Sequence, residues 1–310
     1  TDEQSYLLQQ CTVWRRLSVH LGWGFGKTHV DYDEISKNVQ DKLYADAQAF
    51  AKANKDRYDC GGYIYVGEGQ DLGQFWAKLA VGNGKIQKSS SNTAVTQSND
   101  CYSLSGATYG VYSDKGCTKS VATLTTDSNG NTDTVELRAA KYYVKETKAP
   151  KGFQLDKNVY TLTVKAGETA TLKVSDTPKV TDTLVELFKI DMETSKSTAQ
   201  GNSSLEGAEF VWKYYDGYYT KDNLPSEPTR TWTTKTIAEK DSKNEVHYIT
   251  CLADTYKVSG DSFYTQNNTV CLPLGTITVE EKTAPKGYLL EGAYMQAAGS
   301  SEQIKGVYVA

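Results

Sequence analysis

The chain has 310 residues, of which 38% are hydrophobic and 23% charged, and its 34 basic and 38 acidic residues leave a net charge of −4. This balance is typical of a soluble globular chain with two or three domains, and it does not favour nucleic-acid binding. No run approaches the ~18 apolar residues of a membrane span. Only three His and two Met stand against 22 Tyr and 25 Gly, so the composition argues against an enzyme.

Residues 1–56 are predicted to be helical. Apolar residues recur at helical spacing over residues 7–21, and Asp31 with Glu34 forms a capping pattern ahead of a second helix. From Tyr58 the period changes to two, which indicates strands. We expect a small α/β segment over residues 1–83. Because it opens on a helix, with no signal peptide, and is too small for a good core, we expect further chain upstream.

After about residue 84 the helical period ends. Short alternating runs rich in Val, Thr and Tyr are separated by turn sequences such as Lys165-Ala166-Gly167. This pattern predicts a mainly β fold built as a β-sandwich.

An internal repeat divides this β region. Three blocks recur in the same order, and they pair residues 86–88 with 187–189, 104–109 with 205–210, and 144–153 with 279–288. The Lys-to-Gly offset is 18 in both copies (88 to 106 and 189 to 207), whereas the Gly-to-Glu offset is 40 in the first and 74 in the second. The repeat predicts two tandem domains, 84–180 and 181–310, the second with an insertion and an incomplete last strand.

The repeated blocks have a recognisable composition. Each copy has a Lys that ends an apolar strand, a Gly-Ala block, and a Glu ahead of Ala-Pro-Lys-Gly-aromatic. In this the chain resembles the Cna-B-type, SpaA-like (prealbumin-like) domains of Gram-positive surface proteins and pilins, over roughly residues 84–310. The resemblance implies two tandem Ig-like or prealbumin-like sandwiches, and a spontaneous isopeptide bond between Lys and Asp or Asn that a Glu assists. By motif the residues are Lys88, Glu146 and Asp176 in the first copy, and Lys189 and Glu281 in the second.

The same chemistry follows from the physics of a buried site. Burial lowers the pKa of Lys and raises that of a carboxyl group, so it prepares a neutral amine and a neutral acid. A neighbouring Glu can relay the proton, and fixed strands supply proximity. The alternative is an ordinary solvated Lys with a surface Glu. We favour the reactive interpretation because Lys and Glu recur in both copies with the same neighbours.

The second copy lacks an obvious acceptor. Glu146 precedes Asp176 by 30 positions, the same offset from Glu281 gives 311, and no Asp or Asn occurs after Gly292. We expect the acceptor for Lys189 either beyond residue 310 or from elsewhere.

Six cysteines allow 15 disulfide connectivities, and none of them forms a CxxC pair or a zinc-type ligand set. Pairing within each segment is the simplest choice, because each pair flanks a short strand-like stretch. The expected pairs are Cys11–Cys60, Cys101–Cys117 and Cys251–Cys271. Buried free thiols are the alternative, and disulfides would indicate an extracellular protein.

Residues 6–14 resemble the Thr-Gln-x-x-Ile-Trp block of thioester domains in Gram-positive adhesins. The resemblance makes Gln10 a thioester candidate, but Gln9 stands where that block has Thr, and the upstream Cys partner is absent. Cys11 is better explained as a disulfide or core residue. A plain helix that packs Trp14 is the alternative.

Residues 212–219 are rich in aromatic side chains and predict a hairpin around Asp216-Gly217. Tyr214 and Tyr218 could stack on sugars, although cross-strand pairing explains them without a ligand. The three His residues are scattered and predict no metal site.

Together these features predict a stalk or adhesin fragment of a Gram-positive surface or pilus protein, located outside the cell at the wall. No cofactor, nucleic acid or membrane insertion is expected, and no enzyme activity beyond the autocatalytic bond. The expected partners are a host surface protein or glycan, or neighbouring pilus subunits. The alternative is an extracellular glycan- or protein-binding module that uses the insert at 212–270.

Overall fold

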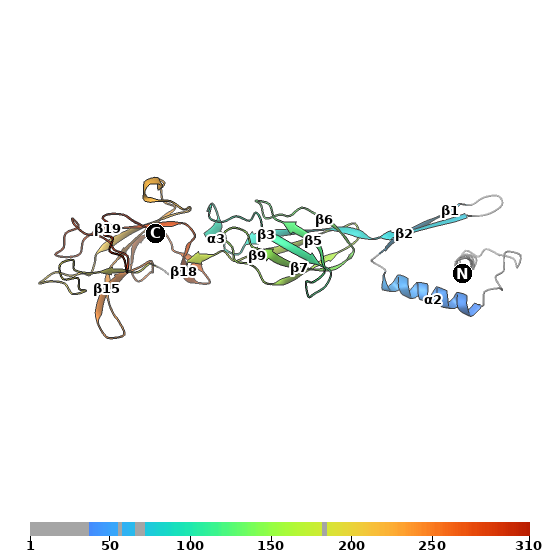
Figure 1. Cartoon of the computed structure of the whole chain (residues 1–310), viewed down its shortest axis with the longest axis horizontal. Coiled ribbons are helices and arrows are strands. Elements are labelled where there is room, and N and C mark those ends of the chain that lie inside the picture. The colour runs from blue at the N-terminus through green and yellow to red at the C-terminus, as the bar shows by residue number, and fades with distance from the viewer. Residues whose placement is uncertain (1–36, 55–57, 66–71, 182–184) are drawn as a thin grey trace. The chain divides into compact units, whose positions relative to one another are not determined.

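The computed structural model describes residues 37–54, 58–65, 72–181 and 185–310, and several of its elements are labelled in Figure 1. Gln10 and Cys11 therefore lie outside the described residues. The described chain is mainly β, as the alternating pattern predicts. It forms two compact units. The first takes in the described residues up to Asn83 with 136–141 and 163–170, and the second takes in the rest of residues 84–310.

The amino-terminal part contains one helix and one antiparallel pair of strands. The helix α2 spans Lys37–Ala53, within the second helix predicted from the sequence. Strands β1 (Tyr58–Tyr65) and β2 (Leu72–Leu79) pair along their whole length. Two apolar residues of α2, Val39 and Phe50, are 47% and 57% exposed.

The first β-sandwich consists of two sheets. One has the order β6-β3-β9 and the other β5-β4-β7-β8. Their bounds are β3 Val81–Ser90, β4 Thr108–Tyr112, β5 Ser120–Thr125, β6 Val135–Arg138, β7 Ala140–Lys148, β8 Val159–Val164 and β9 Thr169–Asp176. A one-turn helix, α3 (Thr93–Thr96), follows β3. Buried and exposed side chains alternate along β3, which is the period of a strand with one face in the core.

The second β-sandwich repeats this arrangement with additions. Its sheets have the orders β16-β13-β12-β19-β20 and β11-β15-β14, and a third sheet has the order β10-β18-β17. The bounds are β10 Val180–Thr181, β11 Leu187–Lys189, β12 Glu209–Tyr215, η1 Lys221–Asn223, β13 Arg230–Lys235, β14 Ile237–Lys240, β15 Val246–Thr250, β16 Lys257–Gly260, β17 Tyr264–Gln266, β18 Thr269–Pro273, β19 Thr276–Thr283 and β20 Tyr308–Val309.

The sequence repeat is also a structural repeat. The order β5-β4-β7-β8 in the first copy corresponds to β13-β12-β19-β20 in the second, and β3 with β6 corresponds to β11 with β15. Much of the extra length of the second copy lies between β15 and β19, where it forms β16, β17 and β18. Strand β9 of the first copy has no counterpart among the described residues of the second.

The aromatic hairpin predicted around Asp216-Gly217 is wrong. Strand β12 ends at Tyr215 and pairs with β13 and β19, and the chain between β12 and β13 is a loop that contains η1. The pairing of Trp212 with Trp232 sets the register of β12 against β13. The hydroxyl of Thr276 bonds the carbonyl of Gly217 and the N–H of Tyr219, which holds the loop against the start of β19.

Hydrogen bonds join the two sandwiches within the second compact unit. The amide of Asn99 donates to the Tyr214 hydroxyl (2.8 Å) and to the Leu274 carbonyl (3.1 Å). The Tyr102 hydroxyl accepts from the N–H of Leu274 and donates to the carbonyl of Lys179. Asn99 and Tyr102 are both buried, so breaking this contact would leave polar groups unpaired.

Candidate functional site

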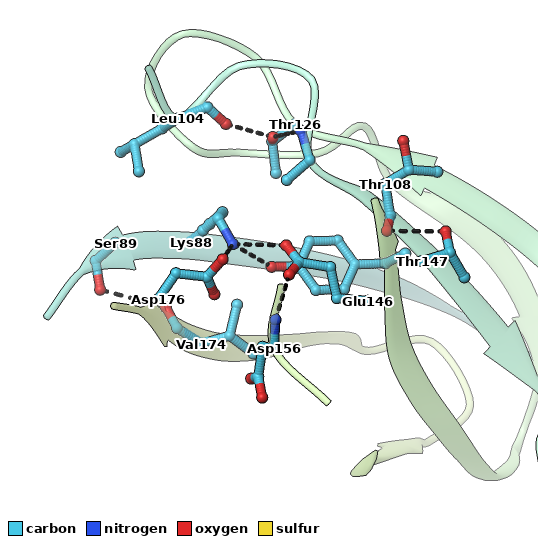
Figure 2. A network of polar contacts seen from close by, with 12 residues as sticks. Lys88, Ser89, Leu104, Thr108, Thr126, Glu146, Thr147, Asp156, Val174 and Asp176 are labelled. Atoms are coloured by element: carbon cyan, nitrogen blue, oxygen red, sulfur yellow. Dashed lines mark hydrogen bonds and ion pairs between the residues drawn. The ribbon is translucent and has the colours of Figure 1, made fainter. Parts of the chain in front are cut away.

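Lys88 is a buried lysine in the first sandwich. It lies on the inward face of β3, two residues after the fully buried Ile86, and its side chain has no solvent exposure. Figure 2 shows its amine between two carboxyl groups, those of Asp176 and Glu146. An isolated ammonium in such a place would be very unfavourable, so these partners decide the chemistry of the site.

Glu146 comes from β7 and faces Lys88 across the core. Its Oε1 lies 2.8 Å from Lys88 Nζ, and its Oε2 accepts the backbone N–H of Asp156 at 2.8 Å (Figure 2). Tyr109 of β4 pairs with Glu146 in the sheet, and its hydroxyl accepts a hydrogen bond of 2.9 Å from Lys88 Nζ. Glu146 is therefore held at both oxygens, with one of them directed at the amine.

Asp176 is the last residue of β9, the strand next to β3. Its Oδ2 is in direct contact with Lys88 Nζ, and neither of its oxygens accepts a hydrogen bond of ordinary geometry. Backbone contacts hold it there: the Asp176 carbonyl accepts the N–H of Ser91 at 2.9 Å, and the Ser89 hydroxyl donates to Val174. The Asp176 carboxyl group is thus held in contact with the amine and has no other ion-pair partner among the described residues.

Burial raises the pKa of the Asp176 carboxyl to about 6, against the opposing effect of Lys88 and with a further contribution from Glu146. Two acids share one amine in a site without solvent, so a neutral carboxyl group is favoured over two carboxylates. Burial is also the main reason why the pKa of Tyr109 is raised, which keeps its phenol neutral. The site can hold a neutral acid against an amine, as amide formation requires.

The second copy has the lysine and the glutamate of the first site, Lys189 and Glu281, but no acid equivalent to Asp176 among the described residues that contact them. Lys189 Nζ lies 2.7 Å and 2.6 Å from the two oxygens of Glu281, so the predicted pair is brought together. The side chains are 16% and 10% exposed, against none for Lys88 and Glu146. In the described part of the chain no second carboxylate forms an ion pair with Lys189.

Asp191 is a buried carboxylate that the sequence analysis did not assign to a site. It is 2% exposed and accepts hydrogen bonds from the Thr194 N–H (2.8 Å), the Thr194 hydroxyl, the Gln200 amide and the Tyr288 hydroxyl (2.8 Å). These bonds, above all the one from the Thr194 N–H, lower the pKa of Asp191. Asp191 therefore ties the loop after β11 to the Ala-Pro-Lys-Gly-Tyr block as a fixed anion.

The thiols of Cys101, Cys117 and Cys251 are free in the structure. Neither the Cys101–Cys117 nor the Cys251–Cys271 pair is formed, and both stay predictions. Cys251 packs in a small cluster with Ile249 and Tyr256, whereas Cys271 belongs to the main core cluster. Burial raises the pKa of the Cys251 thiol to about 11. Cys60 lies in β1, and its partner Cys11 lies outside the described residues.

The proposed sugar-stacking pair of the insert does not form one surface. Tyr214 is 1% exposed and packs edge-on against Tyr264 in the core, whereas Tyr218 is 67% exposed. A buried ring cannot stack on a ligand, so the stacking role considered for Tyr214 is wrong, whereas the binding-module alternative for the rest of the insert stays a prediction.

His247 has acidic neighbours that the sequence did not reveal. Its ring, Asp241 and Glu245 bring three potential ligand atoms within 4.8 Å of one another near the β14–β15 turn. The two acids are exposed, and Asp241 is already engaged by the N–H groups of Lys243 and Glu245. We interpret these residues as a surface turn in which the His247 ring contacts the Asp241 carboxylate.

The first sandwich thus buries Lys88 and Asp176 on the adjacent strands β3 and β9, with Glu146 facing them from β7 of the other sheet. Residues 89–178 match the family model described as SpaA, prealbumin-like fold domain, which confirms the resemblance and the fold predicted from the sequence.

Comparison with individual proteins gives more distant similarities. The chain is 25% identical over 239 residues to the "Trypsin-resistant surface T6 protein" of Streptococcus pyogenes serotype M6, which is 73% of this chain and 41% of that protein. Among solved structures it is similar to the Bacillus anthracis TIE protein (21% identity, TM-score 0.42, 82% of this chain and 38% of that one). It is also similar to a carboxy-terminal fragment of the pilus adhesin SpaC from Lactobacillus rhamnosus GG (17% identity, TM-score 0.34, 67% and 78%).

The chain thus spans about two fifths of the length of the curated relative that it matches. No helix in the described ranges has the length and apolar character needed to span a membrane.

Proposed function

We propose that this chain is a stalk segment of a Gram-positive surface adhesin or pilus-type protein, and that an amide bond between Lys88 and Asp176 locks its first sandwich. The observation that carries the proposal is the direct contact between Lys88 Nζ and Asp176 Oδ2 inside the core, with Glu146 beside them. The prealbumin-like match over residues 89–178 supports it.

The reaction uses only groups of this chain. Lys88 Nζ attacks the side-chain carbonyl carbon of Asp176 and forms the C–N bond. Glu146 takes a proton from the nitrogen and passes it to the leaving oxygen, so the C–O bond breaks and one water leaves. The Tyr109 hydroxyl and the Asp156 N–H orient the amine and Glu146. Enclosure in the core supplies the proximity that replaces chemical activation.

The product suits the core better than the reactants. Two buried charges carry a large desolvation cost, whereas a secondary amide is neutral. The link joins positions 88 and 176, so it closes almost the whole domain. By the loop-entropy argument developed for disulfides, such a closure stabilises the fold by roughly 4–5 kcal/mol. A domain stabilised in this way suits a stalk, as do the hydrogen bonds that join the two sandwiches.

The test is the intact mass of the denatured, reduced protein. Wild type should be lighter than its sequence mass by one water, and digestion should give a branched peptide that joins Lys88 and Asp176. Glu146→Gln should abolish or greatly slow the loss. The control Glu136→Gln changes an exposed acid of β6 and should leave the loss intact. A wild-type mass equal to the sequence mass would overturn the proposal.

The remaining features of the proposal concern context. The domain boundaries 1–83, 84–180 and 181–310 are those that we assign. With the stalk role we propose a location at the outer cell wall and disulfides at the predicted pairs. The proposed partners are pilus subunits or host surface molecules. Gln10 stays a thioester candidate, and no cofactor or enzyme activity is assigned.

A further inference from the structure

The chain that leaves the first sandwich is held by hydrogen bonds along its backbone. We call residues 177–181, which follow β9, the exit segment. The carbonyl of Thr177 accepts the N–H of Gln154 at 3.0 Å, and the N–H of Lys179 donates to the carbonyl of Gly152 at 2.8 Å. The loop after β7 therefore ties the exit segment to the first sandwich.

The same segment also contacts the second copy. Strands β17 and β18 form a hairpin over residues 264–273, which we call the joint hairpin, and no strand pair of the first copy corresponds to it. Strand β10, the last two residues of the exit segment, pairs antiparallel with β18. Gln266 Nε2 also donates to the carbonyl of Pro178 at 3.2 Å. The exit segment thus adds a third strand to the joint hairpin, as an extended peptide does in strand addition.

A phenol and an amide of the first sandwich extend this contact. The Tyr102 hydroxyl donates to the carbonyl of Lys179 at 2.6 Å, and it accepts the N–H of Leu274, directly after the joint hairpin, at 2.9 Å. Asn92, which precedes α3, donates its side-chain amide to the carbonyl of Thr265 at 2.9 Å, and α3 packs against β17. Tyr102 therefore bridges the exit segment and the second copy through one oxygen atom.

Apolar side chains from both sandwiches form one core at this junction. Three buried residues of the first sandwich pack in the same hydrophobic cluster as three buried residues of the joint hairpin: Val95, Tyr102 and Phe153 with Tyr264, Cys271 and Leu272. Domains of one chain move relative to each other by default unless their interface is large and apolar. Separation of these two sandwiches would expose the apolar cluster and break the hydrogen bonds between the exit segment and the joint hairpin.

We propose that the joint hairpin is an internal docking surface whose partner is the exit segment, and that this docking makes the two sandwiches one rigid body. The surface fits an extended backbone strand flanked by the apolar end of a prealbumin-like sandwich. Part of the extra length of the second copy thereby serves to fix the orientation of one domain against the next. None of the contacts named above involves the side chain of Lys88, Glu146 or Asp176, so the inference holds with or without the amide bond.

Nuclear magnetic resonance relaxation tests whether the two sandwiches move together. In the deuterated, isotope-labelled full chain, we expect the backbone amides of both sandwiches to fit a single rotational diffusion tensor. Domains joined by a mobile linker would instead tumble with separate correlation times. Two separate tensors in the wild type would overturn the inference.

Trypsin tests the exit segment directly, because it cleaves after Lys179. In the wild type the bonds of this segment should protect the peptide bond between Lys179 and Val180, whereas the exposed Lys221 of η1 serves as an internal reference. Tyr102→Phe removes two hydrogen bonds of the joint and should speed cleavage after Lys179 about 10-fold, because cleavage follows the population of the open form. The control Tyr112→Phe, on β4, should leave the rate unchanged.

A variant on the other side of the joint completes the test. Gln266→Ala removes the side-chain bond from the joint hairpin to the exit segment, and it should also speed cleavage after Lys179 without a change at the reference site. Equal cleavage at the two lysines in the wild type would show that the exit segment is not held. Rates in Tyr102→Phe and Gln266→Ala equal to the rate in Tyr112→Phe would show that these contacts do not carry the joint.

Discussion

Tyr109 and Phe210 occupy equivalent positions in the two copies, and only Tyr109 has a hydroxyl group that contacts the lysine, at 2.9 Å from Lys88 Nζ. Both rings are buried in the same sheet position, on β4 and β12. The first site therefore has one more group that positions the amine than the second. Tyr and Phe differ by one oxygen atom, so the role of the Tyr109 hydroxyl can be tested with little change in packing.

Tyr109→Phe should slow the loss of water without preventing it. The variant removes one buried hydrogen bond to Lys88, a contribution of about 1 kcal/mol, which corresponds to a rate about 5–10-fold lower. The measurement is intact mass against time after refolding from denaturant. Tyr112→Phe, a change at the other end of β4, is the control. An unchanged rate in Tyr109→Phe would show that the hydroxyl does not position the amine.

The unlinked first sandwich should lose stability as the pH rises. In Glu146→Gln the amide does not form, and burial, the largest cause of the shift, still raises the pKa of Asp176 above its unfolded value near 3.9. The folded state then binds the proton more tightly, so the contribution of this group is complete below about pH 4 and is lost as the pH rises through its raised folded pKa.

Urea unfolding of Glu146→Gln between pH 4 and pH 8 measures this effect. The double variant Glu146→Gln, Asp176→Asn lacks the titrating carboxyl group and should show a much flatter profile. Stability that instead rises over this range would mean that Asp176 is stabilised as a carboxylate, contrary to the effect of burial.

The reduced protein should react with iodoacetamide in a fixed order. Cys117 is half-buried, whereas burial raises the pKa of the Cys251 thiol from 9.0 to about 11 and also raises that of Cys101. At pH 8 the thiolate fraction of Cys251 is then about 100-fold lower than that of a thiol with the ordinary pKa of 9.0. Cys117 is also more accessible than the buried Cys101 and Cys251, so it should be labelled first. Mass mapping gives the order, and equal labelling in the denatured protein is the control.

The same cysteines test the predicted disulfides. Non-reducing peptide mapping of freshly purified protein should recover Cys101–Cys117 and Cys251–Cys271 as linked pairs. Recovery of all four as unlinked thiols would contradict the disulfide prediction.

Asp191→Asn should lower the melting temperature of the second sandwich. The carboxylate accepts bonds from Thr194, Gln200 and Tyr288, and an amide can satisfy only part of them. Because these bonds lower the pKa of Asp191, its contribution is present at neutral pH and is lost in acid. Tyr288→Phe should have a smaller effect, and Asp254→Asn, at an exposed position, almost none. Equal melting temperatures would show that Asp191 is not structural.

The sequence predicted much of the first site because the repeat and the strand period carry it. Alternation along the strand places Lys88 on the same face as Ile86. The recurrence of Lys and Glu in both copies distinguished Lys88 and Glu146 from the many other charged residues of the sequence. The contact of Asp176 with Lys88 follows once β9 is placed beside β3. The signal was that this Lys and Glu have the same neighbours in both copies.

Other parts depend on contacts that local sequence does not encode. The Asp156 N–H that holds Glu146 is a backbone group with no sequence signal. Asp191 is fixed by Gln200 and Tyr288, the latter 97 positions away. The aromatic run looked like a hairpin because Asp-Gly favours tight turns, but the long-range pairing of Trp212 with Trp232 places β12 in the core sheet instead.

The adjacency of β3 and β9 also decides how the first sandwich would respond to pulling. The chain enters the domain along β3 and leaves it after β9, and Lys88, near the end of β3, meets Asp176, the last residue of β9. Once these residues are joined, a tensile load crosses from one strand to the other through a single side-chain bridge. The residues between them then bear no tension, and the roughly 300 Å of extended chain that they could release stays folded under load. The domain would act as a short link of nearly fixed length.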